Sequence, residues 1–235
     1  MIGRIDWIKQ ASVTGMYLAG LVMMGEASAV HFEASSLDSL DKTRAQGVKA
    51  EVVEYHGQKG IHVSVLPGEK PKCENCTFLL LEQEQFRDGT IEISLAGEPV
   101  DQDSATGGVG IVFRVSEDLS KYEGVYFKPS HTEETEYGVR QHYAIQYFSH
   151  PDHSADALNE AASGQYDAPA NVRTGQWFRL KAEINKNQGI FYIDGSKVLV
   201  VERLFHGSEL KGPIGLFVEP GSEGYFSKLE IKHSQ

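Results

Sequence analysis

The chain has 235 residues, of which 40% are hydrophobic and 23% charged, and these ordinary globular values exclude a wholly disordered protein. Its 33 acidic side chains outnumber its 22 basic ones, which gives a formal net charge of −11. Because an acidic surface repels phosphate groups, we expect no nucleic acid partner and no anionic membrane face as a partner.

The first 29 residues differ in character from those that follow. Residues 11–25 are uncharged and mostly apolar, and the Ala-Ser-Ala at 27–29 supplies the small residues that a signal peptidase accepts. The apolar stretch is shorter than the roughly 20 residues that a membrane span needs, which disfavours an anchor. We therefore expect residues 1–29 to be a signal peptide cleaved before Val30. The mature chain, residues 30–235, is then a periplasmic or secreted protein without membrane insertion.

The chain contains two cysteines, Cys73 and Cys76. In an exported protein such a pair favours a local disulfide bond that fixes a turn. A redox function for this C-x-x-C would place the first cysteine at a helix N-terminus, whereas here prolines precede it and the apolar stretch 78–81 follows. A zinc site would need two further soft ligands, and none is close in the sequence. The pattern predicts a Cys73–Cys76 disulfide.

Alternation of apolar and polar residues, the period of a β-strand, dominates the mature chain. Residues 177–184 alternate strictly, and Asp194-Gly195 is typical of a two-residue hairpin turn. Trp177 is expected to be a packing anchor at the start of its strand rather than a ligand-stacking residue. The pattern predicts about eleven or twelve short strands, among them residues 48–55, 61–66, 90–95, 109–115, 122–128, 142–148, 177–184, 190–193, 197–201, 214–218 and 225–231.

Helical periodicity is scarce, and residues 155–162 form the best candidate for a helix. Strands do not alternate with long helices, which excludes a parallel α/β sheet. Several strands have one apolar and one polar face, as two packed antiparallel sheets require. No repeat or linker interrupts residues 30–235. The expected fold class is all-β, one sandwich domain of two antiparallel sheets.

Six segments follow one another in a familiar order. They are FRDGTIE at 86–92, GIVFRV at 110–115, YEGVYFKP at 122–129, AIQY at 144–147, GQWFRLK at 175–181 and FYIDG at 191–195. This succession resembles the concanavalin A-like lectin/glucanase superfamily, and within it exported bacterial domains related to laminin-G-like modules and to keto-disaccharide hydrolase or family-16-like glucanase domains. The resemblance covers roughly residues 48–232 and implies a jelly roll with a convex and a concave sheet, in which glycans usually lie in the concave groove.

Alternation places four polar side chains on a candidate groove face. If Phe113 and Val115 point into the core, Arg114 points to the opposite face, and we expect Tyr126, Lys128 and Gln146 to project with it. Aromatic rings stack on sugars, and fork-shaped donors bind hydroxyl groups. These residue types suit a glycan or oligosaccharide partner. The alternative is a solvated sheet face with ordinary cross-strand pairs.

A catalytic acid pair is harder to find. The family-16 glucanases that the chain resembles carry E-x-D-x-x-E on one strand. The nearest stretch here begins at Glu82 and has Arg87 where the last acid should stand, so the motif is absent. Glycosidases need two carboxylates on either side of the scissile bond. Glu92 and Glu123 remain as isolated strand acids and as candidates for an acid or base.

No cofactor and no metal site is expected from the sequence. The loop Asp101-Gln102-Asp103-Ser104 offers oxygen ligands for calcium, but it lacks the full spacing of a calcium loop, and a solvated turn is the favoured interpretation. His150 and His153 lie in a proline-containing loop that does not fix both imidazoles on one face.

Three classes of function follow from these observations. An exported glycan-binding module agrees with the resemblance, the signal and the polar-aromatic face. A glycoside hydrolase of the family-16-like or keto-disaccharide hydrolase-like type is the alternative, although its acid-pair motif is absent. A non-sugar adhesion or structural module is the third, because the same sandwich serves many roles.

Overall fold

The computed structural model describes residues 33–35, 37–66, 76–100, 108–131 and 143–234. Contacts divide the chain into two units, Met1–Val30 and His31–Gln235. All of the described residues belong to the second unit, and the fold below is that unit's fold. The predicted signal peptide, Cys73 and the candidate calcium loop at 101–104 lie outside the described residues, so the predictions for them stay predictions.

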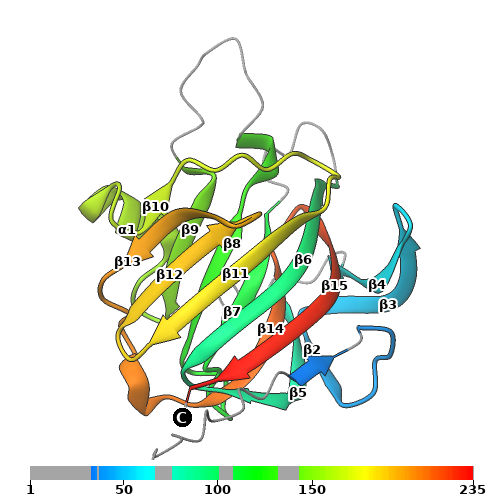
Figure 1. Cartoon of the computed structure of the whole chain (residues 1–235), viewed down its shortest axis with the longest axis horizontal. Coiled ribbons are helices and arrows are strands. Elements are labelled where there is room, and N and C mark those ends of the chain that lie inside the picture. Colours follow the sequence, from blue (N-terminus) through cyan, green and yellow to red (C-terminus); the bar gives the residue numbers. More distant parts are fainter. Residues whose placement is uncertain (1–32, 36, 67–75, 101–107, 132–142, 235) are drawn as a thin grey trace, which may run out of the picture. The chain divides into compact units, whose positions relative to one another are not determined.

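The described chain forms two antiparallel β-sheets that pack face to face (Figure 1). Sheet A contains β1 Glu33–Ser35, β3 Val48–Tyr55, β4 Gln58–Val65, β6 Gly89–Pro99, β11 Phe178–Asn185, β12 Gln188–Ile193, β13 Ser196–Val201 and β15 Ser222–His233. Its order is β13-β12-β11-β6-β15-β4-β3, with β1 also paired to β15.

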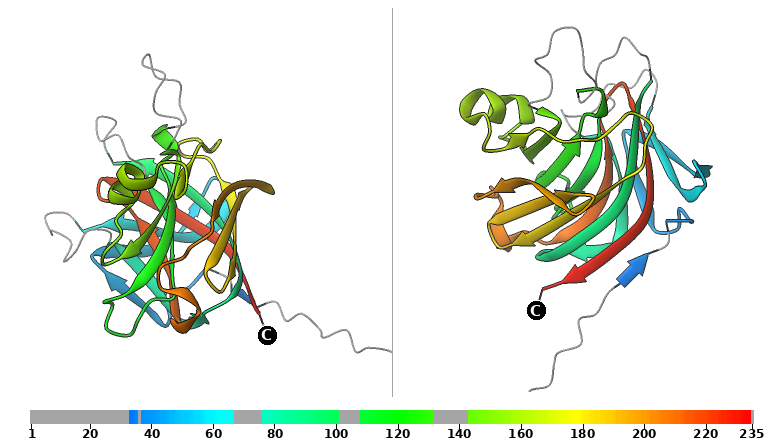
Figure 2. Two further views of the ribbon diagram at one scale, coloured as in Figure 1. Left: turned by 90° about the vertical axis from the view of Figure 1, so that its left-hand side faces the viewer. Right: turned by 45° about the horizontal axis from the view of Figure 1, so that its top comes forward.

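Sheet B contains seven strands, with three short helical segments described beside them. Its strands are β2 Thr43–Gln46, β5 Phe78–Phe86, β7 Val109–Phe113, β8 Tyr122–Phe127, β9 Ile145–His150, β10 Asp167–Ala168 and β14 Gly212–Val218. Their order is β10-β9-β8-β7-β14-β5-β2. The helical segments are α1 Ala155–Ala162 and the 3-10 turns η1 Pro129–His131 and η3 Gly207–Glu209. Helix α1 lies beside β9 (Figure 2).

Local sequence explains the regular elements. Strand β11 buries every second side chain, from Phe178 to Ile184, as its strict alternation predicts. Asp194 and Gly195 both have positive φ, at 47° and 81°, which is the geometry of the hairpin turn between β12 and β13. Helix α1 begins after Ser154, whose hydroxyl accepts a hydrogen bond from the Ala157 amide at 3.2 Å.

The main core lies between the sheets. It is built from the inward-facing side chains of both, such as Ile93 and Leu180 from sheet A and Ile111 and Leu216 from sheet B, and these four are fully buried. Burial of apolar surface on this scale is the dominant stabilising contribution to a sandwich. The predicted all-β class and its two antiparallel sheets are confirmed.

A second apolar cluster covers the outer face of sheet B, where a polar groove face was expected. Its largest members are Phe78, Tyr122, Tyr126, Phe148 and Phe217, each at most 2% exposed. Glycines make room for the side chains of this cluster: a Cβ added at Gly124 would meet the Phe148 ring, and a Cβ at Gly215 would lie 2.6 Å from Val112 Cγ2. Sheet B is therefore largely apolar on both faces, and its buried polar side chains lie at the two ends of β7 and β8.

Candidate functional site

Arg114 does not lie on the outer face of sheet B, which corrects the sequence expectation. Strand β7 ends at Phe113, and Arg114 takes a left-handed φ of 55°. This turn reverses the alternation, so that Val115 joins the outer apolar cluster instead of the core between the sheets. The Arg114 side chain is fully buried.

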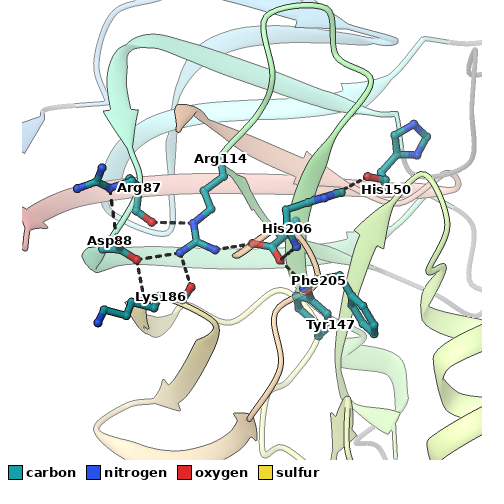
Figure 3. Close-up of polar contacts among 9 residues, drawn as sticks. Arg87, Asp88, Arg114, Tyr147, His150, Lys186, Phe205 and His206 are labelled. Atoms are coloured by element: carbon teal, nitrogen blue, oxygen red, sulfur yellow. Dashed lines mark hydrogen bonds and ion pairs between the residues drawn. The ribbon is translucent and has the colours of Figure 1, made fainter. Parts of the chain in front are cut away.

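The Arg114 guanidinium is occupied by contacts within the chain (Figure 3). Its Nη1 donates to Glu123 Oε2 at 2.9 Å, and its Nη2 donates to Asp88 Oδ1 at 2.9 Å. Nη2 also donates to the Lys186 carbonyl at 2.7 Å, and Nε to the Arg87 carbonyl at 2.7 Å. Four hydrogen bonds to protein groups leave the guanidinium with little capacity for a ligand.

Glu123 is the second fully buried member of this network. Its Oε1 accepts hydrogen bonds from the Tyr147 hydroxyl at 2.9 Å and from the His206 amide at 3.1 Å. Burial and the Glu123 charge raise the pKa of Tyr147 well above its usual value. Both Glu123 oxygens are thus bound to protein donors, which differs from the position expected for a catalytic acid facing a groove.

The network joins segments that are far apart in the sequence. Asp88 lies in the turn between β5 and β6, Lys186 in the turn between β11 and β12, and His206 follows β13. Arg114 and Glu123 come from sheet B, so the ion pairs connect the ends of both sheets. A buried charge pair with satisfied hydrogen bonds fixes one arrangement of these turns. We assign the network a structural role.

Glu92 lies on the outer face of sheet A, away from Glu123. Its carboxylate is 3.5 Å from Arg179 Nε, and Lys181 is its cross-strand partner. The outer face therefore carries ordinary charge pairs of the kind that exposed sheets use. Because Glu123 faces the interior and Glu92 faces outward from the other sheet, the two acids do not border a common groove.

The three other expected ligand residues do come together, near the end of β8 on sheet B. The Tyr126 hydroxyl donates to Gln146 Oε1 at 2.8 Å. Lys128 Nζ lies 5.3 Å from the centroid of the Tyr126 ring and 3.5 Å from Glu219 Oε1. We call these four residues, Tyr126, Lys128, Gln146 and Glu219, the sheet-B polar cluster.

Glu219 is a member that the sequence did not reveal. It directly follows the apolar strand β14, and its amide donates to the Gly108 carbonyl at 2.9 Å. A Cβ added at Gly108 would lie 2.5 Å from Glu219 Oε2, so the glycine leaves the space that the carboxylate occupies. Its position depends on this long-range pairing, for which a local pattern holds no signal.

The electrostatics of Glu219 are unusual for a carboxylate. Burial raises its pKa, Lys128 opposes that shift, and Asp156 adds to it. Its Oε2 atom is buried and, within the described part of the chain, accepts no hydrogen bond. A buried acceptor without a donor is costly, so this atom is the natural position for a donor from a ligand.

The sheet-B polar cluster is more enclosed than the open groove expected from the sequence. Tyr126 and Gln146 are 2% and 3% exposed. The Lys128 and Glu219 side chains are 11% and 17% exposed and form the accessible edge of the cluster.

Among the described residues, no group of three or more His, Cys, Asp or Glu side chains is arranged to hold a metal ion. Nor does the described chain contain a helix that is long and apolar enough to cross a membrane.

Comparison with solved structures places the fold. The chain is similar to the carbohydrate binding module CBM66 from Bacillus subtilis, with a TM-score of 0.54 and 13% identity over 81% of this chain and 95% of that one. A protein of unknown function with a galectin-like fold from Bacillus subtilis has a TM-score of 0.51 and 14% identity over 86% and 94% of the two chains. The Crh5 transglycosylase in complex with NAG has a TM-score of 0.50 and 15% identity over 87% and 84%.

These similarities establish the fold, a β-sandwich of two antiparallel sheets that the chain shares with these three structures. No family model and no curated protein matches the sequence. The expectation drawn from the order of the strand segments is thus confirmed at the level of the fold. Function has to be argued from the site.

Proposed function

We propose that this protein is an exported glycan-binding module that holds its ligand at the sheet-B polar cluster. The observation that carries the proposal is the buried Glu219 Oε2, an acceptor without a donor beside the Lys128 ammonium. Similarity in fold to the carbohydrate binding module CBM66 supports the same class of function.

The chemistry of the cluster suits a sugar. A glycan hydroxyl donates to Glu219 Oε2 and accepts from Lys128, because a hydroxyl is both a donor and an acceptor. The Tyr126 ring is 2% exposed and lies 5.3 Å from Lys128 Nζ, so it holds the ammonium in place rather than stacking on the sugar. The hydrogen bond from Tyr126 to Gln146 holds both side chains in one geometry, which lowers the entropy lost on binding.

The proposal is tested with a panel of polysaccharides and the mature protein, by measuring retention. Tyr126→Phe removes a hydroxyl and Glu219→Gln replaces a carboxylate by a neutral amide, and we expect each to weaken retention at least tenfold. Tyr192→Phe and Glu183→Gln are matched controls, because the Tyr192 hydroxyl donates to Glu183 Oε2 at 2.9 Å on sheet A. Equal losses in both pairs of variants would contradict the assignment of the site. If no glycan is retained, a non-sugar adhesion or structural module becomes the better description.

A glycoside hydrolase is the second candidate, and the raised pKa of Glu219 favours it. Burial keeps this carboxyl protonated to higher pH, which is the state that a general acid needs. Glu92 and Glu123 do not border a common groove, so the hydrolase would use Glu219 instead. Release of reducing ends that Glu219→Gln abolishes supports the enzyme, whereas retention without release supports the module.

Export and the disulfide are part of the proposal. We infer that cleavage before Val30 yields a periplasmic or secreted domain, residues 30–235, and that Cys73 and Cys76 are bonded in it. The Cys76 Sγ lies 3.2 Å from the Tyr122 hydroxyl in the outer cluster of sheet B. Intact mass of the exported product should show loss of the first 29 residues, and thiol labelling without reductant should find no free cysteine. A full-length product, or quantitative labelling, would refute the respective claim.

A further inference from the structure

The outer face of sheet A carries a second set of polar side chains, on β3, β4, β15 and β6. Cross-strand register places Glu51, His62 and Tyr225 in one row, and Ser64, Glu223 and Glu98 in the next. Residues two apart on a strand share a face, and Val63 on β4 and Phe226 on β15 point into the core, so all six lie on the outer face. We call these six residues the sheet-A acidic patch.

Aromatic rings hold the carboxylates of this patch in place. The Tyr225 ring stacks on the Tyr55 ring at 3.7 Å and on the His62 ring at 4.7 Å between centroids. The His62 ring nitrogens lie 3.1 Å from Glu51 Oε1 and 2.8 Å from Glu223 Oε2. The Tyr55 hydroxyl donates to Glu98 Oε1 at 2.7 Å. The patch is therefore an ordered arrangement of acceptors on a stacked aromatic support.

The three carboxylates of the patch, Glu51, Glu98 and Glu223, share one base within it, His62, which pairs with Glu51 and Glu223. Within the described part of the chain, no lysine or arginine forms an ion pair with Glu51, Glu98 or Glu223. Lys49, the cross-strand partner of Ser64, is exposed at the edge of the patch. Burial and then the charges of Glu223 and Glu98 raise the pKa of Tyr225 to about 12. Hence the region has a negative potential that favours a cation.

Two buried oxygen atoms on β4 add an independent observation. Ser64 is 7% exposed, and its Oγ is buried without a hydrogen-bond partner among the described residues. The same holds for Gln58 Oε1, on the same face of the strand. Buried polar atoms of native proteins are normally paired, so the unpaired Ser64 Oγ, in register with Glu223, indicates where a donor from a ligand binds. Gln58 lies at the far end of β4, in register with Tyr55, and is not part of this site.

We propose that the sheet-A acidic patch binds a primary ammonium group, which Glu98, Glu223 and Ser64 accept together. An ammonium carries three donors and no acceptor, and its compact charge matches three acceptors that are neighbours in the sheet. An N-deacetylated amino sugar and a lysine side chain share this chemistry. The site lies on the opposite sheet from the glycan site proposed above and does not depend on it.

The proposal is tested by titrating the exported protein at fixed ionic strength with three probes. The probes are a glucosamine trimer, its fully N-acetylated counterpart and Nα-acetyl-lysine methylamide, with binding followed by isothermal titration. We expect the glucosamine trimer to bind at least tenfold more tightly than the acetylated one. If Nα-acetyl-lysine methylamide binds as tightly as the glucosamine trimer, the site recognises the ammonium group alone. If the glucosamine trimer binds more tightly, the site recognises an amino sugar. Equal affinity for the acetylated and free trimers overturns the proposal.

Variants separate a built site from general attraction to an acidic protein. Ser64→Ala removes an unpaired hydroxyl, so we expect an unchanged melting temperature and an affinity for the glucosamine trimer that falls several-fold. Glu98→Gln should lower that affinity at least tenfold. Glu54→Gln, an exposed carboxylate on the same strand as Glu51, makes the same change in charge and should have no effect. Equal losses for Glu54→Gln and Glu98→Gln, or no loss for Ser64→Ala, would overturn the proposal.

Discussion

Replacement of Glu123 by Gln tests whether this acid is structural. Arg114 and Glu123 are both fully buried, and their atoms lie 2.9 Å apart. Removing one partner of such a pair typically costs about 3–5 kcal/mol, because the other charge is left uncompensated. Here Asp88 still faces the guanidinium at 2.9 Å, and the glutamine oxygen can still accept from Tyr147. We therefore expect the lower end, about 3 kcal/mol.

That loss is measurable by denaturant or thermal unfolding. For a domain of this size, each kcal/mol lowers the melting temperature by about 2–4 °C, so we expect a decrease of about 6–12 °C. Glu92→Gln is the matched control, since its ion pair with Arg179 is partly exposed and such pairs contribute about 0–1 kcal/mol.

A double-mutant cycle isolates the interaction itself. Arg114→Met alone leaves a buried carboxylate, so the double variant Arg114→Met/Glu123→Gln should lose less stability than the sum of the single losses. The structural assignment fails if the free energy of unfolding of Glu123→Gln lies within about 0.5 kcal/mol of the wild-type value, the usual range for an uninvolved surface residue. It also fails if Glu123→Gln abolishes turnover of a glycan without changing the free energy of unfolding.

Three further predictions follow from individual contacts. The pKa of Asp118 is lowered to about 2 by hydrogen bonds from the Ser120 hydroxyl and amide and from the Ser116 hydroxyl. The contribution of Asp118 to stability is therefore present above pH 3.8 and is lost as the pH falls toward 2. An NMR titration that finds the Asp118 carboxyl titrating near pH 3.8 would contradict this prediction. Gly110→Ala places a Cβ against the Val125 carbonyl in the neighbouring strand. A denaturant unfolding measurement should show that the free energy of unfolding falls by about 1–3 kcal/mol. An unchanged free energy of unfolding would refute this close approach. Glu223→Gln replaces a charged acceptor beside Tyr225 by a neutral amide, so spectrophotometric titration should find the pKa of Tyr225 below about 12. An unchanged pKa would show that the Glu223 charge does not contribute to the shift.

Much of the fold could be predicted from local patterns. The alternation in β11, the hairpin turn at Asp194-Gly195 and the bounds of α1 all rest on neighbouring residues, and the structure has them as expected. Strands β1, β2 and β10 were missed because they have only three, four and two residues, too few for a period to be read. The apolar outer face of sheet B had a signal in the continuous apolar stretches of β5 and β14, which indicate strands buried on both faces.

The candidate site was less predictable, and the reasons are physical. Tyr126 and Gln146 were placed together because both strands keep their alternation up to these residues. Arg114 was misplaced because a single left-handed residue reverses the alternation, and no local pattern announces it. Glu219 and the partners of Glu123 come from distant segments, so only the tertiary fold brings them into contact.

Glycan binding at the sheet-B polar cluster is tested most directly by NMR chemical-shift mapping. The protein is titrated with the glycan that shows the strongest retention. The side-chain amide of Gln146 and the backbone amides of Lys128 and Glu219 should shift with a single binding isotherm, while Tyr192 and Glu183 on the outer face of sheet A stay unchanged. Shifts confined to sheet A, or spread evenly over both sheets, would contradict the account.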